Sequence, residues 1–349
     1  MLNLQKLLFR VDASTAIGAG HLMRCIALAQ SLQRAGGKAV FAVATKLGKL
    51  QLRLREEEIE THQLSVAPGS IQDAIETISL ARELKATWLI VDGYHFDVRY
   101  QQQVKATELK LLFIDDCGDA GHYYADLVLN QNICANESLY QHREPYTQLL
   151  LGSRYVLLRE EFLQWQAWKW EIPGVARKVL VTLGGSDPEN MTFKVIKALQ
   201  QVEIQDLEVI AIVGGSNPHY EQLQLLMKQS HVSISLKRNV SNMPELMAWA
   251  DVAIAGGGLT SWELGFMGVP SILIVLAEHQ RENVNQLAQR RACLSMNSQG
   301  GLSLEEMAQV ITFLIRSFTE RKAVSYVSRT LFDGFGSSRV LEKMMMPQM

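Results

Sequence analysis

The sequence predicts an α/β protein made of two Rossmann-like domains, and three observations support this prediction. Short, apolar, β-rich runs alternate with helical patterns, as in parallel sheets that are covered by helices. This alternation occurs twice, before and after an irregular, tryptophan-rich stretch at residues 165–174. The chain has 349 residues, which is more than a single hydrophobic core usually serves.

Apolar runs define the expected strands in both halves of the chain. In the first half they are 7–11, 39–44, 88–92, 111–115 and 127–130. In the second half they are 179–183, 209–213, 232–236, 252–255 and 272–275. The first helix follows Gly20 and ends at Gly36-Gly37, because glycine commonly terminates helices. The later helices are expected at 189–201, 219–229, 243–250, 260–267 and 282–290, with Pro188 near a first helical position.

The domain boundaries follow from where the alternation stops and restarts. We expect a first domain at 1–163, a linker at 164–177, a second domain at 178–335, and a C-terminal helix with a frayed tail at 336–349. The linker assignment depends on the tryptophan-rich stretch, which interrupts the pattern just before a fresh strand.

Composition excludes several classes of protein. The 34 basic and 36 acidic residues leave a formal charge of −2, and no basic run offers the electrostatic surface that nucleic acid needs. The four cysteines are scattered, which is typical of reduced thiols in the cytoplasm rather than of disulfides or zinc sites. We therefore expect a cytoplasmic protein, with a monomer favoured, that has no export signal, no membrane span, no bound metal and no cofactor.

The most informative stretch is a glycine turn, Gly18-Ala19-Gly20-His21, that follows the first strand. It delivers His21 to an expected helix N-terminus, where backbone N–H groups point outward and favour anions. The local field disfavours an extra proton on the imidazole, so we expect a neutral ring that can accept one. The alternative is a histidine that only caps the helix or lies on the surface.

Two further glycine turns follow strands of the second half. The turn at Gly184-Gly185-Ser186 either faces a phosphate or is a tight turn that needs glycine. The turn at 256–258 opens a helix in which Thr260 can bind phosphate oxygens and Glu263 can accept ribose hydroxyls. Its alternative is a plain capping arrangement.

Other chemistries have weaker support. A dinucleotide fingerprint would need glycine where Met23 stands and an acid after the second strand, and both are missing. Gly-x-Ser-x-Gly, the motif of a Ser-His-Asp hydrolase, is absent. Asp115-Asp116 with His122 suggests a metal site, but no His or Cys pair has metal-ligand spacing.

An ordered set of motifs along nearly the whole chain resembles a known family. The motifs are Arg10-Val11-Asp12, Gly18-Ala19-Gly20-His21 with Arg24, Asp92-Gly93-Tyr94, Ile114-Asp115-Asp116, Leu129-Asn130, Leu183-Gly184-Gly185-Ser186, Gly257-Gly258-Leu259-Thr260 with Glu263, and Asp333-Gly334-Phe335-Gly336. The set is similar to the UDP-2,4-diacetamido-2,4,6-trideoxy-β-L-altropyranose hydrolase family of pseudaminic acid biosynthesis, which is related to the spore-coat polysaccharide group.

The resemblance implies a glycosyltransferase-B arrangement with an interdomain cleft and with water as the sugar acceptor. It implies that His21 is the catalytic base and that the substrate contacts are Arg10, Asp12, Gly20, Tyr94 and Asn130. It further implies that UDP is bound by Gly184, Gly185, Ser186, Met243, Gly257, Gly258, Thr260 and Glu263, with Glu263 on the ribose and Met243 near uracil. A UDP-sugar-dependent glycosyltransferase and a non-catalytic nucleotide-sugar binding protein are the alternatives.

Overall fold

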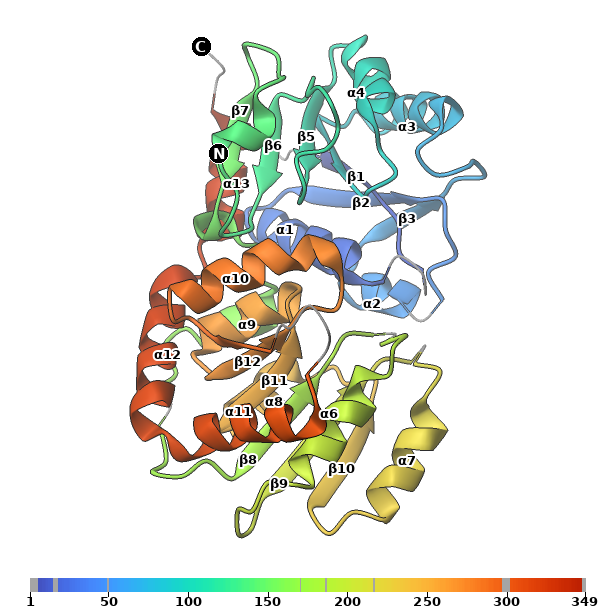
Figure 1. Ribbon diagram of the computed structural model, residues 1–349. Coiled ribbons are helices and arrows are strands. Elements are labelled where there is room, and N and C mark those ends of the chain that lie inside the picture. The colour runs from blue at the N-terminus through green and yellow to red at the C-terminus, as the bar shows by residue number, and fades with distance from the viewer. Residues whose placement is uncertain are drawn as a thin grey trace. The chain divides into compact units, whose positions relative to one another are not determined.

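The computed structural model describes residues 6–14, 18–48, 50–169, 171–185, 187–215, 217–296 and 302–346. The chain divides into two compact units (Figure 1). Unit 1 comprises Met1–Glu160 together with Gly334–Met349, and unit 2 comprises Glu161–Asp333. Unit 1 is therefore discontinuous in sequence, because its last helix follows unit 2 along the chain.

Unit 1 contains a seven-stranded parallel sheet in the order β3-β2-β1-β4-β5-β6-β7. Its strands are β1 (Lys6–Val11), β2 (Lys38–Val43), β3 (Glu60–Gln63), β4 (Trp88–Asp92), β5 (Lys110–Ile114), β6 (Leu127–Asn130) and β7 (Gln148–Leu151). The strand order reverses between β1 and β4, which pair from Leu7↔Trp88 to Val11↔Asp92. Such a reversal is a topological switch point, where open α/β sheets bind ligands beyond the carboxyl ends of the strands.

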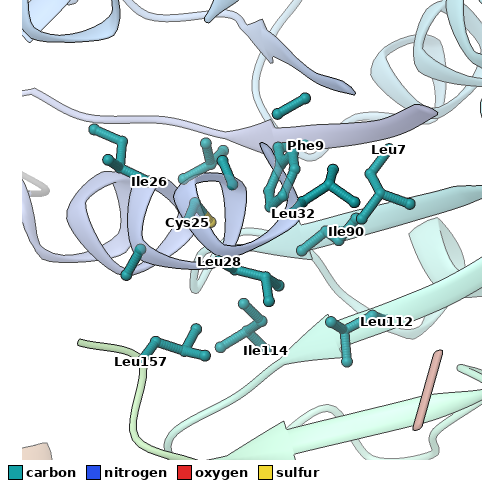
Figure 2. Packing of buried hydrophobic residues seen from close by; sticks show 14 of the residues in the cluster. Leu7, Phe9, Cys25, Ile26, Leu28, Leu32, Ile90, Leu112, Ile114 and Leu157 are labelled. Carbon is teal, nitrogen blue, oxygen red and sulfur yellow. The ribbon is translucent and has the colours of Figure 1, made fainter. Parts of the chain in front are cut away.

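Helices cover both faces of this sheet. They are α1 (Gly20–Arg34), α2 (Leu50–Glu56), α3 (Ile71–Glu83), α4 (Val98–Lys105) and α13 (Gly336–Met345), with short 3-10 helices at Glu137–Tyr140 and Ser153–Tyr155. Alternate residues of β1 enter different cores: Leu7 and Phe9 pack with α1, whereas Leu8 packs with residues of α3 and α4. Figure 2 shows Cys25, Ile26, Leu28 and Leu32 of α1 against the first of these cores. Because both faces are buried, the strands read as continuous apolar runs.

Unit 2 contains a six-stranded parallel sheet in the order β10-β9-β8-β11-β12-β13, which reverses between β8 and β11. Its strands are β8 (Lys178–Thr182), β9 (Glu208–Val213), β10 (Ser233–Arg238), β11 (Val252–Gly256), β12 (Ser271–Ile274) and β13 (Leu294–Ser295). Its helices are α6 (Met191–Leu199), α7 (Tyr220–Lys228), α8 (Met243–Trp249), α9 (Leu259–Met267), α10 (Arg281–Gln289), α11 (Leu304–Arg316) and α12 (Phe318–Leu331), with short turns at Glu160–Leu163 (α5) and Glu278–Gln280. Across the described residues of both units, no helix combines the length and the apolar character needed to cross a bilayer.

The predicted fold class, two Rossmann-like α/β domains, is confirmed by these two parallel sheets. The sequence missed three strands, β3, β7 and β13, and all three lie at sheet edges. The missed strands have only four, four and two residues, so they lack the long run that marked the others. The fourth edge strand, β10, has six residues and was predicted. The expected place of Pro188 was also wrong, because α6 begins later, at Met191.

A glycine ties the last helix to unit 1. Gly336 is the first residue of α13, which packs against α1 and the 3-10 turn Ser153–Tyr155. A Cβ atom at this position would lie 2.0 Å from the carbonyl oxygen of Val156 and 2.6 Å from the carbonyl carbon of Tyr155. Both neighbours are backbone atoms, so no side-chain rotation relieves the clash. Glycine is needed here because two backbones approach closely.

We predict that Gly336→Ala destabilises unit 1 by about 1–3 kcal/mol, the usual cost of overpacking. Thermal unfolding together with hydrogen exchange of the α13 amides measures the effect. Ser337→Ala is the matched control, because the Ser337 hydroxyl is buried without a hydrogen-bond partner and its loss should cost little. Equal stability of the two variants would contradict the packing role of Gly336.

Candidate functional site

His21 lies at the switch point of unit 1. It is the second residue of α1, whose N-cap is Ala19, and its side chain is largely buried. The helix begins where the chain leaves β1, and the neighbouring strand β4 ends at Asp92. The sheet topology therefore brings the imidazole and the Asp92 carboxylate to the same edge.

The His21 ring and the Asp92 carboxylate form a buried pair. The Nδ1 atom of His21 lies 2.6 Å from Oδ1 of Asp92. Burial alone would raise the pKa of Asp92, but Arg24 and His21 outweigh it and hold that pKa well below its usual range. An ionised Asp92 accepts a hydrogen bond from Nδ1–H, and in a neutral ring with this tautomer Nε2 carries the lone pair. The pair can thus present a proton acceptor at a fixed orientation.

Tyr94 completes the immediate surroundings of His21. Its ring meets the imidazole edge to face, with centroids 4.7 Å apart. Its hydroxyl donates to Oδ2 of Asp116 over 3.1 Å, while about half of the residue stays exposed. Partial removal of the phenol from water and the negative charge of Asp116 raise the pKa of Tyr94 well above its usual value, so the phenol remains a neutral donor. A cavity of about 20 Å³ borders His21, Arg24 and Tyr94, which is room for about one water molecule.

Two of the predicted substrate contacts, Arg10 and Asp12, lie in a buried ionic cluster. Arg10 and Asp12 have side chains with no solvent exposure, and they pair with each other over 2.7 Å. Arg10 also donates two hydrogen bonds to Asp73, both of 2.8 Å, and its guanidinium lies over the ring of Phe96. These contacts support the end of β1 from within, and a substrate contact at Arg10 or Asp12 stays a prediction.

The Asn130 side chain is likewise buried, and a substrate contact there stays a prediction. Its amide donates to the Tyr140 hydroxyl over 2.8 Å, and its carbonyl oxygen accepts from the backbone N–H of Asn132. Gly20 differs, because it is exposed at the first residue of α1. A substrate contact at Gly20 or Tyr94 stays a prediction.

The second switch point, between β8 and β11, gathers two of the predicted nucleotide-binding turns. Gly184 and Gly185 follow β8, whereas 256–258 follow or end β11, and the two strands pair directly. Gly258 is the N-cap of α9, so Thr260 lies in the first turn of that helix. Gly257 also has a packing reason to be glycine, because a Cβ there would lie 2.3 Å from a methyl carbon of Val284.

Helix α6, which follows the turn at Gly184 and Gly185, is already capped by a carboxylate of the protein itself. Both carboxylate oxygens of Asp187 accept hydrogen bonds of 2.8 Å from the backbone N–H groups of Met191 and Thr192, at the start of α6. A phosphate near Gly184 and Gly185 therefore cannot use these two donors while the cap is in place. The predicted contact at Ser186 lies outside the described residues.

The remaining predicted UDP contacts lie on two neighbouring helices. Met243 is the first residue of α8 and is half-buried, whereas Glu263 lies within α9 and is buried. The two helices contact each other. Contacts of Met243 with uracil and of Glu263 with ribose stay predictions.

The possible metal site at Asp115-Asp116 is occupied by protein donors. Asp115 accepts hydrogen bonds from the Tyr123 hydroxyl, 2.9 Å, and from the backbone of Gly118, 2.8 Å. Asp116 forms an ion pair with Arg24, and Nε2 of His122 lies 3.0 Å from Oε1 of Glu144. In the described ranges, no group of three or more His, Cys, Asp or Glu side chains has a geometry that could hold a metal ion.

Sequence reasoning missed the partners of the predicted residues. It placed His21 and Tyr94 in the site but did not pair His21 with Asp92, and it gave Asp116 no role toward Arg24. The sequence contained a signal for these pairs, because Asp92 ends strand β4 and Asp116 closely follows strand β5. Neighbouring parallel strands bring such carboxylates to one edge.

We predict that Asp73→Ala costs about 3–5 kcal/mol of stability, because it leaves the fully buried Arg10 with one carboxylate fewer. Asp97→Ala is the control: Asp97 caps α4 at an exposed position, so its loss should cost only about 1 kcal/mol. Thermal unfolding measures both. A smaller loss for Asp73→Ala than for Asp97→Ala would exclude a supporting role for the Arg10 cluster.

Comparison with known proteins shows several similarities over large parts of the chain. Residues 179–325 match the glycosyltransferase family 28 C-terminal domain. The spore coat polysaccharide biosynthesis protein SpsG of Bacillus subtilis is 25% identical over 94% of this chain and 94% of its own length. The UDP-2,4-diacetamido-2,4,6-trideoxy-β-L-altropyranose hydrolase of Campylobacter jejuni is 29% identical over 69% of this chain and 81% of its own length.

Two further similarities extend this picture. The uncharacterized protein MJ1062 of Methanocaldococcus jannaschii is 25% identical over 79% of this chain, and the match spans 57% of that longer protein. The crystal structure of Acinetobacter baumannii MurG superimposes with a TM-score of 0.67 at 17% identity, over 97% of this chain and 99% of MurG. That likeness shows a shared fold. The chain is thus similar to the hydrolase and the spore-coat protein that its motifs resemble, and residues 179–325 of unit 2 match the glycosyltransferase family 28 C-terminal domain.

Proposed function

We propose that the protein hydrolyses a UDP-linked deoxy-diacetamido sugar to free sugar and UDP, with UDP-2,4-diacetamido-2,4,6-trideoxy-β-L-altrose as the first candidate, in pseudaminic acid biosynthesis. The observation that carries the proposal is the buried pair of His21 and Asp92 at the switch point of unit 1. The name of the hydrolase relative supports the substrate class, and the glycosyltransferase domain in unit 2 supports a sugar nucleotide.

In the proposed reaction, Nε2 of His21 accepts a proton from a water molecule. The oxygen of that water forms a bond to the anomeric carbon while the bond from that carbon to the β-phosphate oxygen breaks, and UDP leaves with the electron pair. Attack from the face opposite UDP inverts the configuration. Asp92 keeps its hydrogen bond to Nδ1–H and stabilises the imidazolium that forms.

Unit 2 would bind the nucleotide at its own switch point. The backbone N–H groups at the start of α9 and the Thr260 hydroxyl suit the negative charge that grows on the leaving diphosphate. Glu263 would accept hydrogen bonds from the ribose hydroxyls. Such donors stabilise the leaving group without a bound metal, so we expect metal-independent turnover.

A glycosyltransferase is the second candidate, because the family 28 domain in unit 2 is named for sugar transfer and one fold serves both chemistries. A transferase would pass the sugar to a hydroxyl acceptor, with the same histidine as base. A non-catalytic nucleotide-sugar binding protein is the third candidate. The buried carboxylate behind His21 argues against it, since simple binding does not need an oriented proton acceptor.

The deciding experiment is turnover of the candidate UDP-sugar in water enriched in oxygen-18. Hydrolysis by attack at carbon should place the label in the anomeric hydroxyl of the released sugar and none in UDP. Label in UDP would show attack at phosphorus instead. Release that depends on an added acceptor would favour the transferase, and no release of UDP from a panel of UDP-sugars would favour the binding protein.

We predict that His21→Ala lowers kcat by about 10²–10⁴-fold, the usual contribution of a general base. UDP affinity, measured by calorimetry, should stay within error of the unaltered protein. Near-normal turnover would exclude the role of His21.

Glu263→Ala is the matched control for that variant. It should weaken UDP binding, because the ribose hydroxyls lose their acceptor, whereas any kcat at saturating substrate should fall far less than in His21→Ala. An unchanged UDP affinity would exclude the role of Glu263 on the ribose but would leave the role of His21 unaffected.

A further inference from the structure

Arg24 is held by two buried carboxylates at once. Its Nε and Nη2 atoms donate to the two oxygens of Asp92, both over 2.7 Å. Its Nη1 and Nη2 atoms donate to the two oxygens of Asp116, over 2.7 and 3.0 Å. The side chains of Arg24, Asp92 and Asp116 are 4%, 0% and 9% exposed, so water screens these charges weakly.

The charges of this cluster do not cancel. Coulombic attraction to both carboxylates outweighs burial and raises the pKa of Arg24, and the same guanidinium lowers the pKa values of Asp92 and Asp116 despite their burial. One positive charge therefore faces two negative charges, which leaves one negative charge in excess. Oδ1 of Asp92, which Arg24 and His21 share, is the oxygen that meets the imidazole.

We propose that Arg24 and Asp116 are positioning residues that set how strongly His21 accepts a proton, an inference that deepens the proposed function and rests on it. Asp116 accepts two of the hydrogen bonds that the Arg24 guanidinium donates, so the positive charge of Arg24 neutralises Asp92 only in part. The remaining negative charge on Asp92 attracts the proton that His21 receives from water. When the proton arrives on Nε2, the imidazolium balances the excess negative charge. The cluster is thus complementary to the protonated state of His21, which forms during the reaction.

Asp116 also links this charge balance to Tyr94. The same carboxylate accepts from the Tyr94 hydroxyl over 3.1 Å, and the Tyr94 ring packs on His21. The Asp116 side chain therefore holds Tyr94 against His21 and also sets the net charge of the cluster with Arg24 and Asp92. The charged and titratable groups around the imidazole are Asp92 from β4, Arg24 from α1 and Tyr94 from the loop after β4, while Asp115 and Asp119 from the loop after β5 line the adjoining cavity.

The test is Asp116→Asn, which keeps the shape and removes the charge. Arg24 and Asp92 then neutralise each other, so His21 should accept a proton less readily. We predict that the acidic limb of the kcat–pH profile moves toward lower pH by about one unit and that kcat at neutral pH falls about tenfold, because the base is weaker. Asp116→Glu, which retains the charge, should restore the position of the limb.

Two control variants separate this effect from others. Tyr94→Phe removes the hydroxyl and keeps every charge, so it should leave the acidic limb in place. Asp119→Asn removes an exposed negative charge from the same loop, and screening by water should make its shift much smaller. An acidic limb that is unmoved in Asp116→Asn, or that moves equally in Asp119→Asn, would overturn the proposal.

NMR titration of the His21 ring distinguishes failure of this inference from failure of the proposed function. It is measured on the full chain, with His21→Gln used to assign the signal. His21 in Asp116→Asn should take up its proton at lower pH than in the unaltered protein, whether or not any UDP-sugar is hydrolysed. If Asp116→Asn folds poorly, Asp116→Ser serves as the second uncharged variant. An unchanged titration in the folded variant would refute the inference even if hydrolysis were established.

Discussion

The bidentate contact between Arg24 and Asp92 is the interaction on which the site of unit 1 depends. It connects the first turns of α1 to the last residue of β4, and so holds the helix that carries His21 against the strand that carries its partner. A buried carboxylate is costly unless it is paired and hydrogen-bonded. Arg24, His21 and the Cys25 thiol all contact Asp92. The position of the imidazole is therefore fixed by charge as well as by packing.

The two units use the same topological device for different tasks. In each sheet the strand order reverses once, between β1 and β4 in unit 1 and between β8 and β11 in unit 2. The loops beyond those strands diverge, because the connecting helices lie on opposite faces of the sheet. Unit 1 fills this place with ionisable side chains, whereas unit 2 fills it with glycines and a helix N-terminus. Ionisable side chains, as in unit 1, can accept or hold a proton, whereas glycines at a helix N-terminus, as in unit 2, favour an anion.

The sequence was a good guide to the central strands and to helices α1, α6 to α10 and α13, because these depend on local apolar patterns. Helices α2, α3, α4, α11 and α12 were not predicted. Strands β4 and β6 fall on the predicted residues, since each is a short buried run between polar segments. Three of the four edge strands, β3, β7 and β13, were missed, and each is only two to four residues long. The longer edge strand β10 was predicted although its residues are not buried. The internal partners of Arg10 and Asp12 were missed for another reason: the residue types of a charged pair near a strand end do not reveal which distant residues it contacts. The hydrogen bonds from Arg10 to Asp73 join residues that are far apart in the sequence.

The partners of His21 were likewise beyond the reach of local patterns. The imidazole and Asp92 are 71 residues apart in sequence, and Arg24 and Asp116 are 92 apart. Their meeting is decided by which strands become neighbours in the sheet. Family resemblance identified the histidine, but the charge balance around it emerges only when the carboxylates are seen together.

The return of α13 to unit 1 has a consequence for synthesis of the chain. Unit 2 is continuous, Glu161–Asp333, and can fold as soon as its own residues have left the ribosome. Unit 1 emerges first but lacks the helix that packs on α1 until translation has passed residue 345. Unit 1, which carries His21, is thus completed after unit 2, so nascent chains that stop early contain a folded unit 2 before α13 supports the helix that carries His21.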